Sequence, residues 1–422
     1  PAPTLDDETR RLYAEMPVAG VTLFRANASD PTTMRTLVSD LHDLDPSFPP
    51  LVAIDHEGGR VHRLSPPFTH FPPAATVAAA GLKTVRAVAT AMARELAALG
   101  IDLTFAPVLD VASNPANPII GDRAYGSTPD SAAAAALASF RAMRAVGLVT
   151  CGKHFPGHGD TATDSHLELP VVTRDRRALT ATELAPFRAA VAAKVPMLMT
   201  AHVRYPALDR DLPATLSRPI VTTLLRRRLG FRGVIATDDL EMRAIADHWG
   251  PGETAVRALA AGCDLLLFCH RQDWLRTAVA SVEEAVETGR LPMTRVAEAY
   301  RRVTTLMRWR HRHAKRERLA KDTPEYAAVE SLLGDLDRAV EERRHRQIVR
   351  VAKVGYWIAG VATAASIASA WYARSQAESA ALSAISAKAS AASIVSQPAL
   401  PATPLAVPTS APAAIGTATP KP

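Results

Sequence analysis

Short apolar runs alternate with longer segments of helical period from residue 20 to residue 270 of this 422-residue chain. Thr84–Leu99 and Ser131–Val146 are typical of the helical segments, with apolar residues at three- to four-residue spacing. Strands that alternate with helices in this way pair in parallel, with the helices packed outside the sheet. The apolar runs predict strands at Gly20–Phe24, Leu51–Asp55, Asp102–Asp110, Leu148–His154, Val195–His202, Gly233–Asp239 and Asp264–Cys269.

Polar side chains gather at the carboxyl ends of the predicted strands. Asp55, Asp110, His154, His202 and Asp238 each lie at or next to the end of an apolar run. In a TIM barrel the carboxyl ends of the strands and the loops that follow them face one mouth, where catalytic groups lie. We therefore predict an α/β fold of the TIM (β/α)8 barrel type, with its active site at that mouth.

The predicted barrel lacks one strand. A closed barrel of this type needs eight strands, and the sequence predicts seven. Only residues 1–20 precede the first of them, Asp6–Met16 has a helical pattern, and the chain begins with proline. Because an unclosed barrel exposes two strand edges, we expect that the first strand is missing from a truncated N-terminus. A seven-stranded variant is the alternative.

The character of the chain changes after residue 310. We predict a barrel over 1–310 and a basic, charged helical segment over 311–353. Residues 354–373 hold no charge over twenty positions, the length of a transmembrane helix, with aromatic residues near both ends. A soluble alanine-rich helix is the alternative. Residues 374–422, rich in Ala, Ser and Pro, are expected to be a disordered tail.

The charge pattern around residues 354–373 predicts a location. Five basic residues precede this stretch and a single one, Arg374, follows it closely. Basic flanks of membrane helices stay in the cytoplasm. We therefore expect a cytoplasmic barrel that is tethered to the cytoplasmic face of the inner membrane through residues 354–373.

The net charge of +7 lies mostly in residues 301–350, which hold fourteen Lys and Arg against eight Asp and Glu. No zinc-finger spacing or aromatic RNA-binding pattern accompanies this basic block, so we predict no nucleic-acid partner. The three cysteines lie in or beside apolar runs, which indicates buried thiols and not a disulfide framework.

The loop Lys153–His166 carries six ionisable or imidazole side chains in fourteen residues. A stable fold has no need of so many at one strand end, so chemistry is the better explanation. His154, His158, His166 and Asp160 could ligate zinc. However, the loop lacks the paired histidines of an HExxH helix and is rich in glycine, so we predict no metal site.

Asp164 and His166 form a candidate dyad in this loop. Residues two apart in an extended backbone project to the same side, so the carboxylate could orient the imidazole and raise its basicity. Histidine is well suited to proton transfer near neutral pH. The dyad therefore predicts general acid/base chemistry.

Two further loops and one strand end add candidate binding groups. Asp55 and the arginines of the loop after it could grip adjacent hydroxyls of a polyol, although a loop ion pair is an equal alternative. The loop at 117–126 contributes Arg123. Of the adjacent Asp238 and Asp239, only one can face the mouth, where a carboxylate could serve as a nucleophile.

These segments together resemble glycoside hydrolase family 3, and within it the bacterial β-N-acetylglucosaminidases. The matching pieces occur in order and span most of residues 20–270, and six in order are specific. They are Ile54–Arg63, Gly121–Arg123, Lys153–Gly159, Asp164–His166, Met199–Pro206 and Gly233–Met242.

The resemblance implies a retaining mechanism through a covalent glycosyl-enzyme. Asp238 matches the nucleophile of the family, and His166, oriented by Asp164, matches its acid/base. The substrate implied is a muropeptide, N-acetylglucosamine joined to 1,6-anhydro-N-acetylmuramic acid, in peptidoglycan recycling, and no cofactor is expected. The residues expected to bind the sugar are Asp55, Arg63, Arg123, Lys153, His154 and His202.

Three other functions remain open. A β-glucosidase of the family would lack the Asp-Ser-His loop. A glycoside phosphorylase would profit from an acid/base without negative charge, because phosphate would be repelled less. A membrane-tethered homologue without activity is a different class, but every predicted catalytic residue is present.

Overall fold

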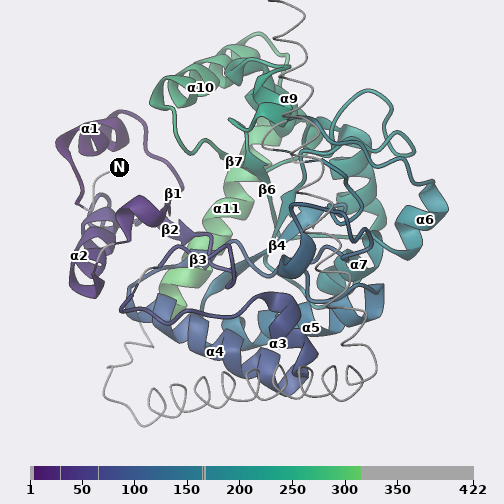
Figure 1. The fold of residues 1–422 in the computed structure, drawn as a ribbon. Coiled ribbons are helices and arrows are strands. Elements are labelled where there is room, and N and C mark those ends of the chain that lie inside the picture. The colour runs from purple at the N-terminus through teal and green to yellow at the C-terminus, as the bar shows by residue number, and fades with distance from the viewer. Residues whose placement is uncertain (1–3, 29, 65, 164, 166–167, 315–422) are drawn as a thin grey trace, which may run out of the picture. The chain divides into compact units, whose positions relative to one another are not determined.

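The computed structural model of the protein describes residues 4–28, 30–64, 66–163, 165 and 168–314. Within them seven strands pair in parallel, each with the next along the chain, which confirms the predicted parallel α/β sheet (Figure 1). The strands are β1 (Gly20–Leu23), β2 (Leu51–Ile54), β3 (Leu103–Thr104), β4 (Val149–Phe155), β5 (Met197–Thr200), β6 (Val234–Asp239) and β7 (Leu265–Leu267).

The third strand is much shorter than the sequence predicted. β3 covers Leu103–Thr104, whereas the apolar run extends to Asp110. Pro107 interrupts the ladder because proline has no N–H to donate. Pairing with β4 resumes only as a single bridge between Val108 and Lys153.

The sheet is a half-barrel, not a closed one. No ladder joins β7 to β1 among the residues that the structure describes, and no eighth strand occurs among them. The structure therefore has the seven strands that the sequence predicted. Its fold is related to the TIM barrel, but one side of the barrel is open.

The helices that the sequence predicted are present. The pattern at Asp6–Met16 forms a helix that Asp6 caps, since its Oδ1 accepts from the N–H of Thr9 at 2.7 Å. The helices are α1 (Asp7–Glu15), α2 (Pro31–His42), α3 (Ala74–Ala79), α4 (Leu82–Ala98), α5 (Pro129–Ala145), α6 (Arg176–Ala181), α7 (Leu184–Ala192), α8 (Arg243–Ala246), α9 (Pro251–Ala261), α10 (Gln272–Glu287) and α11 (Met293–Ala314).

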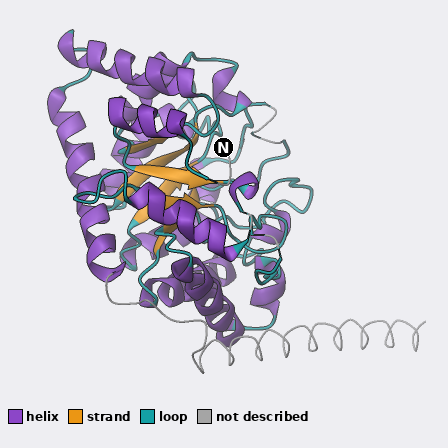
Figure 2. Cartoon of the chain, turned by 90° about the vertical axis from the view of Figure 1, so that its left-hand side faces the viewer, coloured by secondary structure: helices purple, strands orange, loops and turns teal. Residues whose placement is uncertain are grey.

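Helices cover the outer face of the sheet (Figure 2). Val52 and Ile54 of β2 pack in one cluster with apolar residues of α2 and α4. Leu198 of β5 and Ile235 of β6 pack in a second cluster with residues of α5, α7 and α9. Burying these side chains supplies most of the free energy that holds the layers together, at roughly 25 cal/mol per Å² of apolar surface.

The last helix covers the inner face. Val303, Leu306 and Met307 of α11 are buried in a cluster with residues of β2 to β6, and Figure 1 shows α11 running alongside these strands. Arg310 on the same helix forms a buried ion pair of 3.0 Å with Asp102, which precedes β3. The concave side of the half-barrel is therefore filled by a helix at the end where the strands begin.

The C-terminal predictions fall mainly outside the described residues. α11 continues through residue 310 to Ala314. The remainder of the basic segment 311–353, the stretch 354–373 and the tail 374–422 lie beyond the described part of the chain. Among residues 4–314 that the structure describes, no helix combines the length and the apolar character that a membrane span needs.

Candidate active site

Three charged side chains lie on the inner face of the sheet, at the carboxyl ends of their strands. Side chains two apart in a strand share a face, so Asp55, Lys153 and Asp238 follow the apolar residues that pack against α11. Two such residues precede each of them: Leu51 and Ala53, Val149 and Cys151, and Val234 and Ala236. The alternation of side chains along each strand therefore places both the core residues and the site residues on the inner face.

Lys153 is at the centre of a buried ion-pair network. Its Nζ lies 2.7 Å from Oδ1 of Asp55 and 2.7 Å from Oε1 of Glu57. Arg123 binds the same Glu57 through two nitrogens, Nε at 2.8 Å and Nη2 at 2.9 Å. Its Nη1 donates to the carbonyl oxygen of Ile119 at 3.2 Å. The guanidinium of Arg123 is therefore committed to Glu57 and the backbone.

The network keeps Lys153 and Glu57 charged. Burial by itself would lower the pKa of Lys153, but Asp55 and Glu57 raise it above its usual value. Burial would raise the pKa of Glu57, and Arg123 and Lys153 hold it well below the usual range. Two cations and two carboxylates thus balance at the strand ends, where an unpaired buried charge would cost several kcal/mol.

Arg63 lies at the outer edge of this network. Its Nη2 is 3.6 Å from Oδ2 of Asp55, and its guanidinium lies 6.0 Å from the ring centroid of Phe24. The Arg63 side chain is 31% exposed and that of Asp55 is 24% exposed, against 4% for Lys153. Asp55 and Arg63 are therefore the members that a ligand can reach directly.

Asp110 fixes the position of His154. Its Oδ2 lies 2.7 Å from Nδ1 of His154, and its Oδ1 accepts from the backbone N–H of His158 at 2.7 Å. Burial favours the neutral carboxyl, but the facing His154 and these hydrogen bonds lower the pKa of Asp110. The ring of His154 is consequently held by an ionised carboxylate that is fully buried.

Asp238 is poised to be ionised. Burial raises its pKa, while His154, His202 and Lys153 together lower it below its usual value. Its Oδ1 accepts a hydrogen bond of 2.9 Å from the N–H of Asp239. A carboxylate that stays ionised beside three basic groups can act as a nucleophile.

Asp239 has the opposite environment. Burial raises its pKa to about 6, and its Oδ1 accepts from the N–H of Glu241 at 3.1 Å. Its carbonyl oxygen accepts from Nε2 of His202 at 2.9 Å, and Nδ1 of His202 lies 2.8 Å from the Thr215 hydroxyl. Adjacent carboxylates with diverging pKa values are typical of sites where the two groups have different tasks.

The loop after β4 is organised by His158. Its Nδ1 lies 2.8 Å from the hydroxyl of Thr161 and its Nε2 lies 3.2 Å from the hydroxyl of Ser165. The Ser165 carbonyl oxygen accepts from the N–H of Ala244 in α8, which follows β6. Asp160 at the outer part of the loop pairs with Arg174 at 2.6 Å. The His158 ring thus bonds within the loop, and Asp160 is paired with Arg174.

Asp164 and His166 of the predicted dyad lie outside the described residues, and only Ser165 between them is described. Among the described residues, no group of three or more His, Cys, Asp or Glu side chains is arranged to hold a metal ion.

The structure brings together Asp55, Arg63, Arg123, Lys153 and, beside them, His154, His202 and Asp238.

Two buried carboxylates of the site were not among the predicted site residues. Glu57 holds Lys153 and Arg123, and Asp110 holds His154. Both signals were visible, because Asp110 ends an apolar run and Glu57 lies in the loop after Asp55. Their partners are 66 residues away for Glu57 and Arg123, and 44 for Asp110 and His154. Only the fold shows which base each one serves.

The chain matches a known family over most of its length. Residues 3–306 match the sequence profile of the glycosyl hydrolase family 3 N terminal domain. A beta-hexosaminidase of Methylococcus capsulatus is 41% identical over 289 residues, which cover 68% of this chain and 84% of the relative. A beta-hexosaminidase of Alkalilimnicola ehrlichii is 38% identical over 317 residues, or 72% and 90% of the two chains.

Solved structures have the same fold. A family 3 beta-N-acetylglucosaminidase from Paenibacillus superposes with a TM-score of 0.74 and 38% identity, over 78% of this chain and 65% of that one. NagZ from Neisseria gonorrhoeae, in complex with N-trifluoroacetyl-D-glucosamine, superposes with a TM-score of 0.66 and 31% identity, over 79% and 95% of the chains. From the profile, the relatives and the shared fold, the chain belongs to glycosyl hydrolase family 3.

Proposed function

We propose that this family member is a retaining exo-β-N-acetylglucosaminidase. The relatives named beta-hexosaminidase and the solved β-N-acetylglucosaminidases support this activity. The observation that carries the proposal is Asp238, an ionised carboxylate at the end of β6 beside Lys153, His154 and His202.

In the proposed first step, the Asp238 carboxylate attacks the anomeric carbon and His166 donates a proton to the departing oxygen. In the second step, His166 takes a proton from water, which attacks the anomeric carbon and releases Asp238. Two displacements at one carbon retain its configuration. Asp164 would orient the His166 ring throughout, so it is a positioning residue in this scheme.

The sugar would lie over the Lys153 network. Asp55 and Arg63 are accessible, so we assign them the direct hydrogen bonds to hydroxyl groups. Lys153 lies between Asp55 and Glu57, and the charges of His154 and His202 lower the pKa of Asp238. Arg123 would act mainly by holding Glu57, because its nitrogens are already bonded.

We further propose that the substrate is a muropeptide with N-acetylglucosamine at its non-reducing end. The cellular role would be peptidoglycan recycling on the cytoplasmic face of the membrane, with residues 354–373 as the tether. This part of the proposal rests on the Asp164–His166 loop and on the sequence of the C-terminal segment.

Hydrolysis of p-nitrophenyl N-acetyl-β-glucosaminide tests the activity, with the p-nitrophenyl β-glucoside as a control. We expect turnover of the first substrate and little of the second. Preference for the glucoside would instead support a β-glucosidase. The same reaction in phosphate buffer should release free N-acetylglucosamine; the sugar 1-phosphate as main product would support a phosphorylase.

Two adjacent substitutions test the role of Asp238. Asp238→Asn should lower kcat by about 10³-fold or more, since it removes the nucleophile. Asp239→Asn removes the same charge one residue away and should retain turnover within about threefold, because Asp239 faces Glu241. A slowly released fluorinated substrate should add its sugar mass to the peptide that carries Asp238. Equal activity of the two variants would refute the assignment.

A further inference from the structure

A cavity lies at the opposite end of the strands from the candidate active site. Its volume is about 530 Å³, within the range of small-molecule sites. Leu148, Pro196 and Val234 line it, and these residues precede or begin β4, β5 and β6. Leu148 directly precedes β4 and is five residues from Lys153, or roughly 16 Å at 3.3 Å per residue. The two sites are therefore separate.

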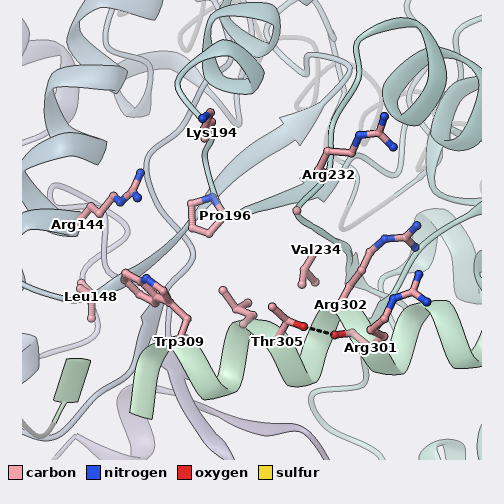
Figure 3. Close-up of a pocket in the computed structure, with 12 residues that line it drawn as sticks. Arg144, Leu148, Lys194, Pro196, Arg232, Val234, Arg301, Arg302, Thr305 and Trp309 are labelled. Carbon is pink, nitrogen blue, oxygen red and sulfur yellow. Dashed lines mark hydrogen bonds between the residues drawn. The ribbon is translucent and has the colours of Figure 1, made fainter. Parts of the chain in front are cut away.

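The cavity has an apolar floor and a basic rim. Leu306 and Trp309 of α11 close one side, and Figure 3 shows Trp309 near Leu148 and Pro196. Leu148, Val234 and Leu306 are buried, whereas four of the five cations around them are exposed and Arg302 is half-buried. The basic residues that line the cavity are Arg144, Lys194, Arg232, Arg301 and Arg302.

The five cations differ in their ion pairs. Arg302 pairs with Asp264 at 2.9 Å and with Glu298 at 3.3 Å. Within the described part of the chain, no ion pair involves the other four, which are Arg144, Lys194, Arg232 and Arg301. Cations that gather around one concavity without counter-charge create a positive potential there, which favours an anionic ligand.

Lys194 occupies a backbone position that favours glycine. Helices α4, α5 and α10 are followed two residues after their last turn by Gly100, Gly147 and Gly289, all with positive φ. The equivalent residue after α7 is Lys194, with φ 57°. A non-glycine residue there costs about 1 kcal/mol. Glycine would fit this backbone at lower cost, and the lysine found there lines the cavity.

We propose that this cavity binds an organic phosphate, a small molecule with one or more phosphate groups and a planar apolar part. Guanidinium groups match phosphate oxygens with paired N–H donors. The apolar floor and the Trp309 ring suit the uncharged part. The proposal is independent of the function proposed for the mouth of the half-barrel.

Calorimetric titration of the full chain with ATP, tripolyphosphate and adenosine tests the proposal. We expect saturable 1:1 binding of ATP, weaker binding of tripolyphosphate, and none of adenosine at the same concentrations. Lys194→Gly and, separately, Arg232→Gln should each weaken ATP binding by about tenfold. Lys194→Gly should also be at least as stable as the natural chain, so that loss of binding cannot be attributed to unfolding.

A double variant of exposed arginines that do not line the cavity, Arg227→Gln with Arg228→Gln, is the matched control. It removes more charge than either test variant and should change ATP affinity by less than about twofold. The proposal is overturned if the natural chain shows no saturable binding, or if the control weakens binding as much as the cavity variants do. Tight binding of adenosine alone would equally refute a phosphate site.

Discussion

The Nζ of Lys153 lies 2.7 Å from Oε1 of Glu57, and each of the two side chains is only 4% exposed. Water therefore has little access to either charged group. Glu57 also binds Arg123 with both oxygens, so this one carboxylate contacts both cations of the network. Glu57 thus holds the side chains of the proposed sugar site in place, although a ligand does not reach Glu57 itself.

Glu57→Gln should therefore destabilise the protein by about 3 kcal/mol, because it leaves a buried cation short of a partner. The free energy of unfolding from urea titrations checks this value. Glu253→Gln breaks an exposed ion pair with Arg257 and should change the same quantity little. A loss no larger for Glu57→Gln than for Glu253→Gln would contradict the structural role.

Asp239→Asn should stabilise the protein at neutral pH. The pKa of Asp239 is raised to about 6, so between about pH 4 and 6 the folded protein binds more protons there than the unfolded chain. The free energy of unfolding therefore falls as pH rises through this window, by at most about 3 kcal/mol. The substitution should remove this fall while an amide oxygen still accepts from Glu241.

Asp238→Asn is the control of opposite sign. The pKa of Asp238 is lowered, so its contribution to stability is present above the unfolded pKa and is lost as pH falls. Urea titrations from pH 4 to 8 should show Asp239→Asn gaining and Asp238→Asn losing stability at pH 7. If both variants gained stability, or both lost it, the environments of Asp238 and Asp239 would not differ as described.

His158→Gln should reduce the acid sensitivity of the fold. Burial lowers the pKa of His158 to about 4, so between about pH 6.5 and 4 the unfolded chain binds more protons. Stability is then lost as pH falls through this window, by at most about 3 kcal/mol for this residue. The variant should be less stable at pH 7, since it loses the contacts to Thr161 and Ser165, but its pH slope should be shallower.

The exposed His248 provides a control for the loss of the contacts to the loop. His248→Gln removes an imidazole without disturbing a buried contact to the loop, so it should change the free energy of unfolding at pH 7 less than His158→Gln does. His56 also has a pKa lowered by burial, to about 3, and is expected to retain part of the slope in the His158 variant. An unchanged slope in His158→Gln would place the acid sensitivity elsewhere.

Met307→Ala tests whether α11 is part of the half-barrel core. Met307 is 2% exposed and packs among inner-face residues of the sheet. Truncating a buried methionine costs about 2–5 kcal/mol through lost burial and the cavity left behind. Arg308→Ala, on the exposed side of the same helix, should change the free energy of unfolding by less than about 0.5 kcal/mol. Similar values for the two variants would contradict the packing of α11 against the sheet.

The sequence alone predicted the seven strands, their parallel order and the strand ends that carry Asp55, Lys153 and Asp238. These features follow from local patterns, since a period of two or 3.6 residues identifies each element and alternation sets the topology. The length of β3 was overestimated, because the effect of Pro107 on pairing depends on its neighbour strand.

Only the tertiary structure decided which carboxylate pairs with which basic side chain, and which helix fills the concave side of the sheet. Glu57 meets Arg123 across 66 residues, and Asp110 meets His154 across 44. No local pattern encodes such pairs, because they depend on where parallel strands bring their carboxyl ends together. The apolar stripe of α11 can be read from the sequence, but its burial against the inner face cannot, because that contact joins the helix to strands far away along the chain.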